Sequence, residues 1–235
     1  VGTEGPRMPN PLERTLAALA LLAASPLLVL LSLIIVMDSP GAPWFVQTRV
    51  GRYGGRFGIL KLRTMHHGAE QRGGALTVAG DDRITRVGGW LRATKLDELP
   101  QLVNVVRGDM ALVGPRPEVP GYVALYDARQ RRVLRVKPGL TDPASLRYRN
   151  ESALLASASD PEWTYRNVVM PDKLALNLAY LDRRTTWSDL GVLFATVVEV
   201  LRPSPHPTRP QEAERVRGAL PASPAVGERS TTSQG

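Results

Sequence analysis

Hydrophobic and polar positions divide the chain into an apolar N-terminal segment, a mixed central region and a polar C-terminal tail. Between Arg14 and Asp38 lie 23 residues without a charged side chain, TLAALALLAASPLLVLLSLIIVM. About 20 apolar residues are enough to cross a bilayer as a helix. No clearly basic stretch precedes the run and no small-residue cleavage site follows it. We therefore expect a membrane segment rather than a cleaved signal peptide.

A proline interrupts this segment at its midpoint. Pro26 follows Ser25 and has eleven residues of the segment on each side. Proline cannot donate a hydrogen bond to the carbonyl of Leu22, so the helix should kink or break there. Each half is about 16 Å long, roughly half of the hydrocarbon core. These lengths allow a helix–break–helix that enters and leaves on one face, with the Ser25 hydroxyl satisfying freed backbone groups. The segment alone favours the commoner alternative, a single kinked span.

The central region alternates short strand-like and helix-like patterns. Two strands, 44–51 and 56–65, are expected to pair as a hairpin around the glycine-containing residues 52–55. In the second strand Lys61 and Arg63 are two residues apart and should share a face. The remaining expected elements are a loop at 66–85, helices at 86–95, 101–107, 121–135, 170–184 and 188–202, a short strand at 110–114, and a turn at 137–143.

This pattern predicts a mixed, helix-rich α/β fold with a membrane segment ahead of a small catalytic domain. We expect an N-terminal tail at 1–10, the membrane segment at 11–37, the domain at 38–202 and a disordered tail at 203–235, where Pro, Ser and Ala dominate. The last predicted helix, capped by Ser188 or Asp189, is apolar over most of its circumference. It should either pack in the core or lie on the bilayer surface.

Composition narrows the possible chemistry. The 235 residues include no cysteine, which excludes disulfides, Cys-ligated metal centres and thiol catalysis. The net charge is +8, and residues 41–149 hold 19 Lys and Arg against 9 Asp and Glu. Such a basic region indicates an anionic partner such as a nucleotide or a phospholipid headgroup. The basic run 128–137 suits either anionic headgroups or a solvated helix face. No nucleic-acid-binding module is recognisable, so we expect no nucleic-acid partner.

The stretch DELPQLVNVVRGDMALVGPRPE (97–118) carries the candidate chemistry. Asp97 is expected near the N-terminus of the helix that contains Pro100, where free N–H groups and the helix dipole stabilise anions. A carboxylate that attacks phosphorus forms an acyl phosphate. Two anions repel each other, so such a site needs cations, and Arg63, Arg92 and Arg116 are candidates. One or two carboxylates together with a phosphate would also suit Mg²⁺.

Either short motif alone is weak evidence. An Asp-Glu pair is more often a helix cap, and Pro-Arg-Pro is more often a rigid turn. However, KLRTM (61–65), DDRITRVGGWLRATKLDELPQLVNVVRGDMALVGPRPE (81–118) and KPGLT (137–141) occur in the order and spacing of one family. From about residue 12 to about residue 202 the chain resembles the bacterial sugar transferases. These are monotopic polyprenyl-phosphate phosphoglycosyl transferases, here in a minimal catalytic form.

The resemblance implies a function and a topology. Ser25 and Pro26 match the break of a re-entrant helix on the cytoplasmic face of the bacterial inner membrane, so the resemblance favours re-entry over a span. The family's aspartate, matched by Asp97, attacks the sugar-bearing phosphate of a UDP-sugar and releases UMP. Polyprenyl (undecaprenyl) phosphate then takes the phosphosugar, which begins exopolysaccharide or lipopolysaccharide assembly. Glu98 would hold Mg²⁺ together with Asp97 or assist proton transfer. The implied phosphate-binding residues are Lys61, Arg63, Arg92 and Arg116.

The chain departs from the family's usual pattern after the PGLT turn. Many members continue with Gly and then Gln, whereas this sequence reads TDPASLRYRNE (141–151). We therefore treat Thr141, Arg147 and Arg149 only as candidate sugar or nucleotide contacts. Neighbouring pairs have simpler interpretations: His66–His67 as solvated side chains, and Asp81–Asp82 as a cap between loop and helix.

Two other functions stay open from the sequence. One is a membrane-anchored scaffold that kept the fold and lost turnover. The other is a single-span anchor with a basic domain for anionic ligands. The oligomeric state, including a homodimer, is not determined by the sequence.

Overall fold

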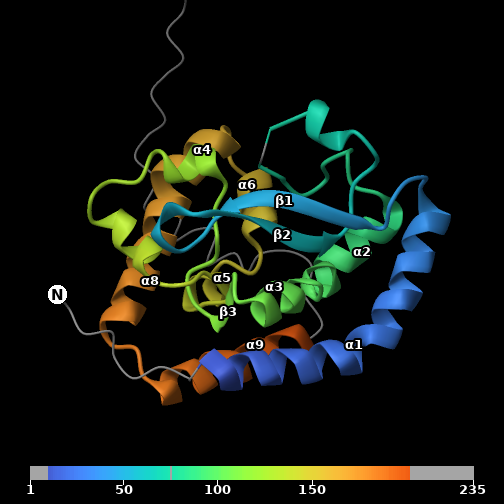
Figure 1. Cartoon of the computed structure of the whole chain (residues 1–235). Coiled ribbons are helices and arrows are strands. Elements are labelled where there is room, and N and C mark those ends of the chain that lie inside the picture. Colours follow the sequence, from blue (N-terminus) through green and yellow to red (C-terminus); the bar gives the residue numbers. More distant parts are fainter. Residues whose placement is uncertain (1–9, 75, 202–235) are drawn as a thin grey trace, which may run out of the picture.

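The protein is a helix-rich, mixed α/β structure (Figure 1). The computed structural model describes residues 10–74 and 76–201. The predicted tails at 1–10 and 203–235 lie outside these residues, apart from Asn10, which begins the first helix. The helices and strands are α1 Asn10–Asp38, β1 Trp44–Val50, β2 Arg56–Leu62, α2 Arg86–Thr94, α3 Gln101–Arg107, β3 Ala111–Val113, α4 Pro120–Val123, β4 Gly139–Thr141, α5 Pro143–Arg147, α6 Glu151–Ala156, α7 Pro161–Thr164, α8 Met170–Asp182 and α9 Thr186–Leu201. Short 3-10 turns occur at Arg52–Gly54, Ala69–Gln71, Leu96–Glu98 and Gln130–Arg135, and a π turn occurs at Tyr165–Val169.

The apolar N-terminal segment forms the single helix α1, which is long and apolar enough to cross a membrane. Only 17% of its most apolar stretch is buried. Figure 1 shows α1 running along the base of the molecule and then turning upward. Pro26 lies inside the helix, and the Ser25 hydroxyl donates to the Leu22 carbonyl at 2.8 Å. That carbonyl is the one that proline leaves without its helical donor. The predicted break is therefore a bend within a continuous helix.

The predicted hairpin is confirmed. Strands β1 and β2 pair antiparallel, from Trp44 opposite Leu62 to Val50 opposite Arg56. In the turn between them Tyr53 (φ 57°) and Gly54 (φ 82°) adopt left-handed backbone conformations. The second strand ends at Leu62, earlier than predicted, so Arg63 lies beyond the regular alternation of side chains.

The turn predicted at 137–143 is wrong for its central residues, which form β4. This strand pairs in parallel with β3, and Val113 lies opposite Thr141. The two chains approach so closely that a Cβ on Gly139, the first residue of β4, would lie 2.1 Å from the Gly114 nitrogen. Only glycine fits such a contact. Because parallel strands end at the same edge of a sheet, residues 114–118 lie beside the segment that follows β4.

The helix predicted at 121–135 is also wrong, because it divides into α4 and the 3-10 turn Gln130–Arg135. Asp127 and Gln130 explain the division. The Asp127 carboxylate accepts from the Gln130 N–H at 2.7 Å, and the Gln130 side chain accepts from the Asp127 N–H at 3.0 Å. This reciprocal pair caps a new helical turn instead of continuing the first.

The predicted loop at 66–85 is confirmed except for the turn Ala69–Gln71, and the helices predicted at 170–184 and 188–202 correspond to α8 and α9. The cap of α9 differs from the prediction. Thr185 and Ser188 cap it together, since the hydroxyl of each accepts from the backbone N–H of the other. Asp189 is instead fully buried and accepts from Arg184 at 2.9 Å.

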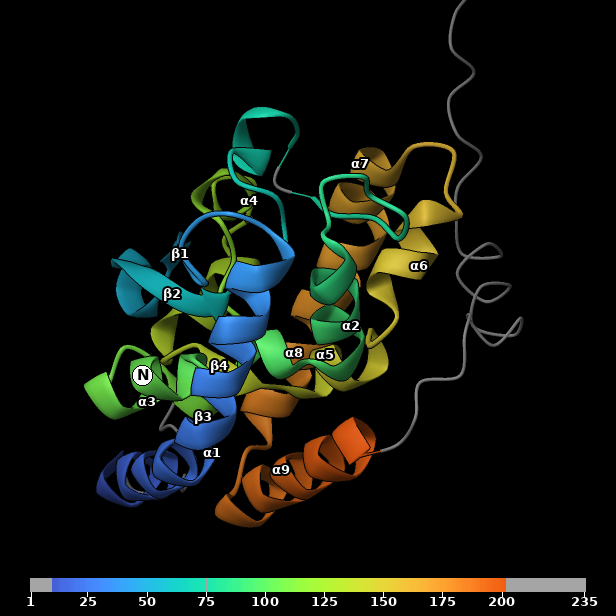
Figure 2. The same cartoon turned by 90° about the vertical axis from the view of Figure 1, so that its right-hand side faces the viewer.

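Helix α9 has both a packed and an exposed apolar side. Val192 is buried in a cluster with Ala17 of α1 and Leu102 of α3. On the other side Trp187 is 82% exposed and Phe194 is 72% exposed. Both views place α9 and the first half of α1 at the base of the molecule (Figures 1 and 2). The two alternatives predicted for this helix, core packing and surface exposure, therefore apply to opposite sides of it.

Substitution of Pro26 by Ala tests the origin of the bend in α1. An alanine restores the donor to the Leu22 carbonyl and is expected to straighten the helix. Spin labels on Leu16→Cys and Met37→Cys, both exposed positions, would measure the change in a chain that has no other cysteine. In a straight helix these positions are about 30 Å apart. We expect the label distance to be shorter in the parent and to approach this value in Pro26→Ala. Equal distances in the two proteins would show that proline does not cause the bend.

Candidate active site

The adjacent acids Asp97 and Glu98 lie in a tight turn between α2 and α3. Lys95 ends α2 in a left-handed conformation (φ 60°), and the 3-10 turn Leu96–Glu98 follows it. Pro100 occupies the cap position of α3, which has no side-chain cap hydrogen bond. The prediction that Asp97 lies near the N-cap is therefore wrong by one turn, because Lys95 redirects the chain before α3 begins. Neither carboxylate caps α3.

Glu98 is paired with two cations. Its Oε2 accepts from Nη1 of Arg116 at 2.8 Å, and its Oε1 accepts from Nη2 of the same guanidinium. The Lys61 ammonium lies 3.5 Å from Oε1. Burial alone would raise the pKa of Glu98, but the charges of Arg116 and Lys61 hold it well below its ordinary value. Glu98 is thus ionised and already neutralised.

Asp97 lies beside this cluster in a different state. Its residue is only 6% exposed, and no hydrogen bond or ion pair reaches its carboxylate from residues 10–74 or 76–201. Burial and then the neighbouring Glu98 charge raise the pKa of Asp97, while Lys61, Lys95 and Arg92 act in the opposite direction. Two adjacent carboxyl groups with oppositely shifted pKa values are typical of sites with separate chemical roles.

Lys61 is the second cation beside Glu98, and its burial disfavours its charged form. Its side chain comes from the end of β2, and its ammonium lies beside Glu98. Burial lowers the pKa of Lys61 to about 8, although the Glu98 charge acts to raise it. The protonated form therefore prevails at neutral pH but is less favourable here than in water.

Arg92 reaches the site because α2 packs tightly on the chain after β2. A Cβ on Gly88 would lie 2.0 Å from the Thr64 carbonyl oxygen, so only glycine permits this approach. One turn later, Nε of Arg92 donates to the Thr64 hydroxyl at 2.8 Å. Burial lowers the pKa of Arg92, and the charge of Asp97 counters this most strongly. The Arg92 guanidinium is therefore fixed through its Nε by Thr64 and lies near Asp97.

Arg63 does not join this cluster. Its guanidinium donates to the Ser39 carbonyl at 2.6 Å, to the Ser39 hydroxyl at 3.0 Å and to the Pro40 carbonyl at 2.9 Å. These groups follow the C-terminal end of α1, where cations satisfy unpaired carbonyls. The expected face shared with Lys61 fails because β2 ends at Leu62. The structure thus brings together Lys61, Arg92 and Arg116 and places Arg63 on α1.

The turn Pro115–Arg116–Pro117 lies at the end of β3, and two acids outside the predicted site, one buried and one half-buried, lie against it. The Arg116 N–H donates to Asp142 at 2.7 Å. Glu118 accepts from Arg49 at 3.0 Å and from the Tyr165 hydroxyl at 2.9 Å. Sequence reasoning assigned no role to Asp142 or Glu118. The available signals were the position of Asp142 directly after a short apolar segment and that of Glu118 directly after the Pro-Arg-Pro motif.

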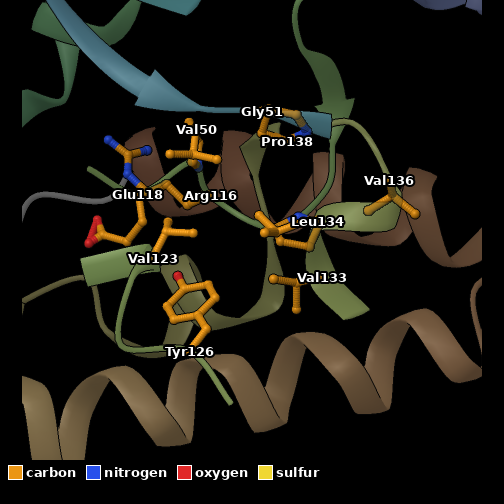
Figure 3. Close-up of a pocket in the computed structure, with 12 residues that line it drawn as sticks. Val50, Gly51, Arg116, Glu118, Val123, Tyr126, Val133, Leu134, Val136 and Pro138 are labelled. Carbon is orange, nitrogen blue, oxygen red and sulfur yellow. The ribbon is translucent and has the colours of Figure 1, made fainter. Parts of the chain in front are cut away.

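A small cavity lies behind this turn (Figure 3). Its volume is about 20 Å³, and apolar side chains such as Val123, Val133 and Leu134 line it. Such a space holds about one water molecule. It therefore belongs to the packing that supports the turn and cannot receive a sugar nucleotide.

The remaining candidate contacts have other partners than Glu98. The Thr141 hydroxyl is 2.7 Å from that of Thr196 on α9, Arg147 lies 3.7 Å from Asp172, and Arg149 lies 2.6 Å from Glu199.

The cap predicted for Asp81–Asp82 is also absent from the described loop. Asp81 pairs with Arg83 at 2.6 Å, and Thr85 caps α2 by accepting from the Gly88 N–H. His66 and His67 belong to no group of three or more metal-ligating side chains in the part of the chain that the structure describes.

The oxygen donors at the site suit a hard divalent cation such as Mg²⁺. Mg²⁺ is usually held by one or two carboxylates together with phosphate oxygens and water, not by a cage of protein ligands. Asp97 and Glu98 are adjacent, and the Asp97 carboxylate has no partner among the described residues. The two carboxylates therefore fit Mg²⁺ bound together with a phosphorylated substrate.

Comparison with known proteins shows the family of the chain. The model of the bacterial sugar transferase family matches residues 8–203. The UDP-glucose:undecaprenyl-phosphate glucose-1-phosphate transferase of Caulobacter vibrioides is 40% identical over 81% of this chain and 68% of its own length. The uncharacterized sugar transferase EpsL of Bacillus subtilis is 34% identical over 79% of this chain and 83% of its own. The undecaprenyl-phosphate glucose phosphotransferase of Komagataeibacter xylinus is 36% identical, but the match spans only 34% of that protein. The chain belongs to the bacterial sugar transferase family.

Proposed function

We propose that the protein is a phosphoglycosyl transferase that moves a sugar-1-phosphate from a UDP-sugar to undecaprenyl phosphate and releases UMP. The names of its relatives in Caulobacter vibrioides and Komagataeibacter xylinus support the substrate classes. The observation that carries the proposal is the unpaired carboxylate of Asp97, a residue only 6% exposed, beside Glu98, whose charge Arg116 and Lys61 already neutralise. Exopolysaccharide or lipopolysaccharide assembly would use the product.

In the first step an Asp97 oxygen attacks the phosphorus that carries the sugar. The bond from this phosphorus to the bridging oxygen breaks, and the bridging oxygen leaves with the electron pair as part of UMP. The sugar phosphate is then joined to Asp97 as an acyl phosphate. The raised pKa of Asp97 makes its ionised oxygen more basic, which favours attack.

In the second step an oxygen of undecaprenyl phosphate attacks the same phosphorus. The bond from phosphorus to Asp97 breaks, and the carboxylate recovers its electron pair. The product is undecaprenyl diphosphate sugar, and the enzyme returns to its starting state. No net proton transfer is needed when both phosphates are fully ionised. The chemistry therefore depends on orientation and on cations more than on an acid or a base.

The cations of the site have distinct tasks in this scheme. Arg116 and Lys61 offset Glu98 and present positive charge to the diphosphate, and Arg92 does the same next to Asp97. Mg²⁺, held by Asp97 and Glu98 together with phosphate oxygens, would neutralise charge on the diphosphate and stabilise UMP as it leaves.

The position of the apolar surfaces suits a lipid acceptor. Most of α1 is exposed and apolar, and the exposed side of α9 adds Trp187 and Phe194 at the same base of the molecule (Figure 2). We propose that α1 enters the bilayer from the cytoplasmic side, bends at Pro26 and returns to that side, with α9 on the membrane surface. This arrangement holds the catalytic domain at the depth of the acceptor phosphate.

Replacement of Asp97 by Asn tests the nucleophile. UMP release with Mg²⁺ and undecaprenyl phosphate, measured over a panel of UDP-sugars, is expected to fall by more than about 10³-fold. Mass spectrometry of the parent, incubated with donor alone, should find a sugar phosphate on the peptide that contains Asp97. Asp82→Asn, at an exposed acid in the preceding loop, is the matched control and should keep full activity. A parent that is inactive over the whole panel would favour the scaffold alternative.

The variant Lys61→Met tests whether the buried ammonium lowers the stability of the fold and whether turnover needs it. Since the folded pKa of Lys61, about 8, lies below the unfolded value of 10.5, the unfolded chain binds more protons between these pH values. The parent should therefore gain stability as pH rises through this window, and Lys61→Met should not. At pH 7 the variant is expected to be more stable by about 1–3 kcal/mol, and turnover should fall at least about 10²-fold.

Thermal melting in detergent and UMP release measure these two effects. Lys173→Met, at a lysine paired with Glu151, is the control and should give no stability gain. A loss of stability in Lys61→Met at pH 7 would contradict the assignment.

Labelling of single cysteines from each side of the membrane tests whether α1 is re-entrant or spans the bilayer. A single cysteine placed within residues 1–9 is compared with Tyr53→Cys, at a position in the catalytic domain that is 74% exposed. If α1 is re-entrant, an impermeant maleimide should label both cysteines in inverted membrane vesicles and neither in intact spheroplasts. Labelling of only the N-terminal cysteine in spheroplasts would establish a span and remove the re-entrant proposal.

A further inference from the structure

The edge of the small parallel sheet brings an acid next to the Pro-Arg-Pro turn. Strands β3 and β4 end together, with Val113 opposite Thr141, so the next residues of each strand are neighbours. Gly114 donates its N–H to the Thr141 carbonyl at 3.0 Å, and Gly139 donates to the Pro115 carbonyl at 3.0 Å. Asp142 therefore emerges directly beside Arg116, although 26 residues separate them along the chain.

The two prolines leave a single backbone donor in this turn. Pro115 and Pro117 have no N–H, so the Arg116 N–H is the only amide of the Pro-Arg-Pro segment that a side chain can fix. The Asp142 carboxylate accepts it at 2.7 Å. A hydrogen bond from a backbone amide to an ionised acceptor is stronger than one between neutral groups.

The Asp142 carboxylate accepts hydrogen bonds from three segments of the fold. Its residue is fully buried, and its other oxygen accepts from the Ser145 N–H at the start of α5. Asn177 of α8 donates to the same oxygen as Arg116 at 3.0 Å. A buried carboxylate is costly unless such donors surround it. All three donors lie on separate segments, so the carboxylate joins the turn to α5 and α8.

The other end of Arg116 reaches the reaction site. Its guanidinium forms the two-pronged pair with Glu98, while its backbone N–H is fixed by Asp142. We propose that Asp142, oriented by Asn177, is a positioning residue that sets the backbone of Arg116 so that its guanidinium meets Glu98 and the donor phosphate. The effect on turnover rests on the proposed transferase function, whereas the effect on the Arg116 backbone does not.

Amide hydrogen exchange tests the placement without turnover. Residues 115–117 contain one exchangeable amide, that of Arg116, so its exchange rate can be read from overlapping peptides or from its own NMR signal. The Ala111 amide, which donates to the Pro138 carbonyl in the same sheet, serves as the internal reference. In Asp142→Asn the Arg116 amide should exchange at least about tenfold faster relative to Ala111. An unchanged ratio would overturn the proposal.

Two other variants guard against a general loss of folding. Asn177→Ala removes one donor and leaves the Asp142 carboxylate in place, so a smaller acceleration of the same amide is expected. Asp81→Asn alters another largely buried aspartate side chain, which pairs with Arg83 in the loop before α2 and not with the turn or its sheet. It should lower the melting temperature and leave the Arg116-to-Ala111 ratio unchanged. Equal acceleration in Asp81→Asn would also overturn the proposal.

A double-mutant cycle on UMP release tests whether Asp142 acts through Arg116. Asp142→Asn is expected to lower the turnover rate about 10²-fold in the parent background, because a small misplacement of a phosphate-binding group is costly. In an Arg116→Lys background the same change should cost less than about threefold, since a flexible ammonium does not depend on a fixed fork geometry. Equal losses in both backgrounds would contradict a role through Arg116. A parent that releases no UMP would refute the transferase proposal, and amide exchange would still decide the placement.

Discussion

The site depends on how two adjacent carboxylates can be buried in one tight turn. Their mutual repulsion and their loss of water both oppose ionisation. The fold supplies cationic partners to one of the two acids and not to the other. Glu98 receives the guanidinium of Arg116 and the ammonium of Lys61, whereas the Asp97 carboxylate has no partner among the residues the structure describes. Neutralising one acid is what allows its neighbour to stay available in the same small volume.

The cations come from parts of the chain that are distant in sequence, and glycines bring these parts together. Lys61 lies at the end of a hairpin strand, and Arg92 lies on a helix that approaches the same segment at Gly88. Arg116 lies at the end of a two-stranded parallel sheet whose chains touch at Gly114 and Gly139. The close backbone contacts at these glycines fix the segments that carry Arg92 and Arg116 beside the two acids. Burial in this cluster lowers the pKa of Lys61, so its charge is held there against the loss of water.

Local features of the structure were predictable from the sequence. The bond from Ser25 to the Leu22 carbonyl follows from the rule for proline in a helix. The helix predicted at 101–107 ends at Gly108 in a left-handed conformation (φ 91°), as glycine commonly does. Non-local features were not. Strand β4 has three residues and no alternation of its own, so only its pairing with β3 identifies it. Arg63 was placed on the wrong surface because the length of a strand is set by its partner. Asp142 escaped notice because it binds a backbone N–H that no residue type reveals.

Arg63 connects α1 to the candidate active site. Its guanidinium is fixed to the carbonyls after α1, and two positions earlier on the same chain the Lys61 ammonium lies 3.5 Å from Glu98. Leu62, which lies between these two basic residues, is buried in one cluster with Leu31 and Ile35 of α1. One short stretch of chain therefore constrains both the end of α1 and the ammonium that pairs with Glu98.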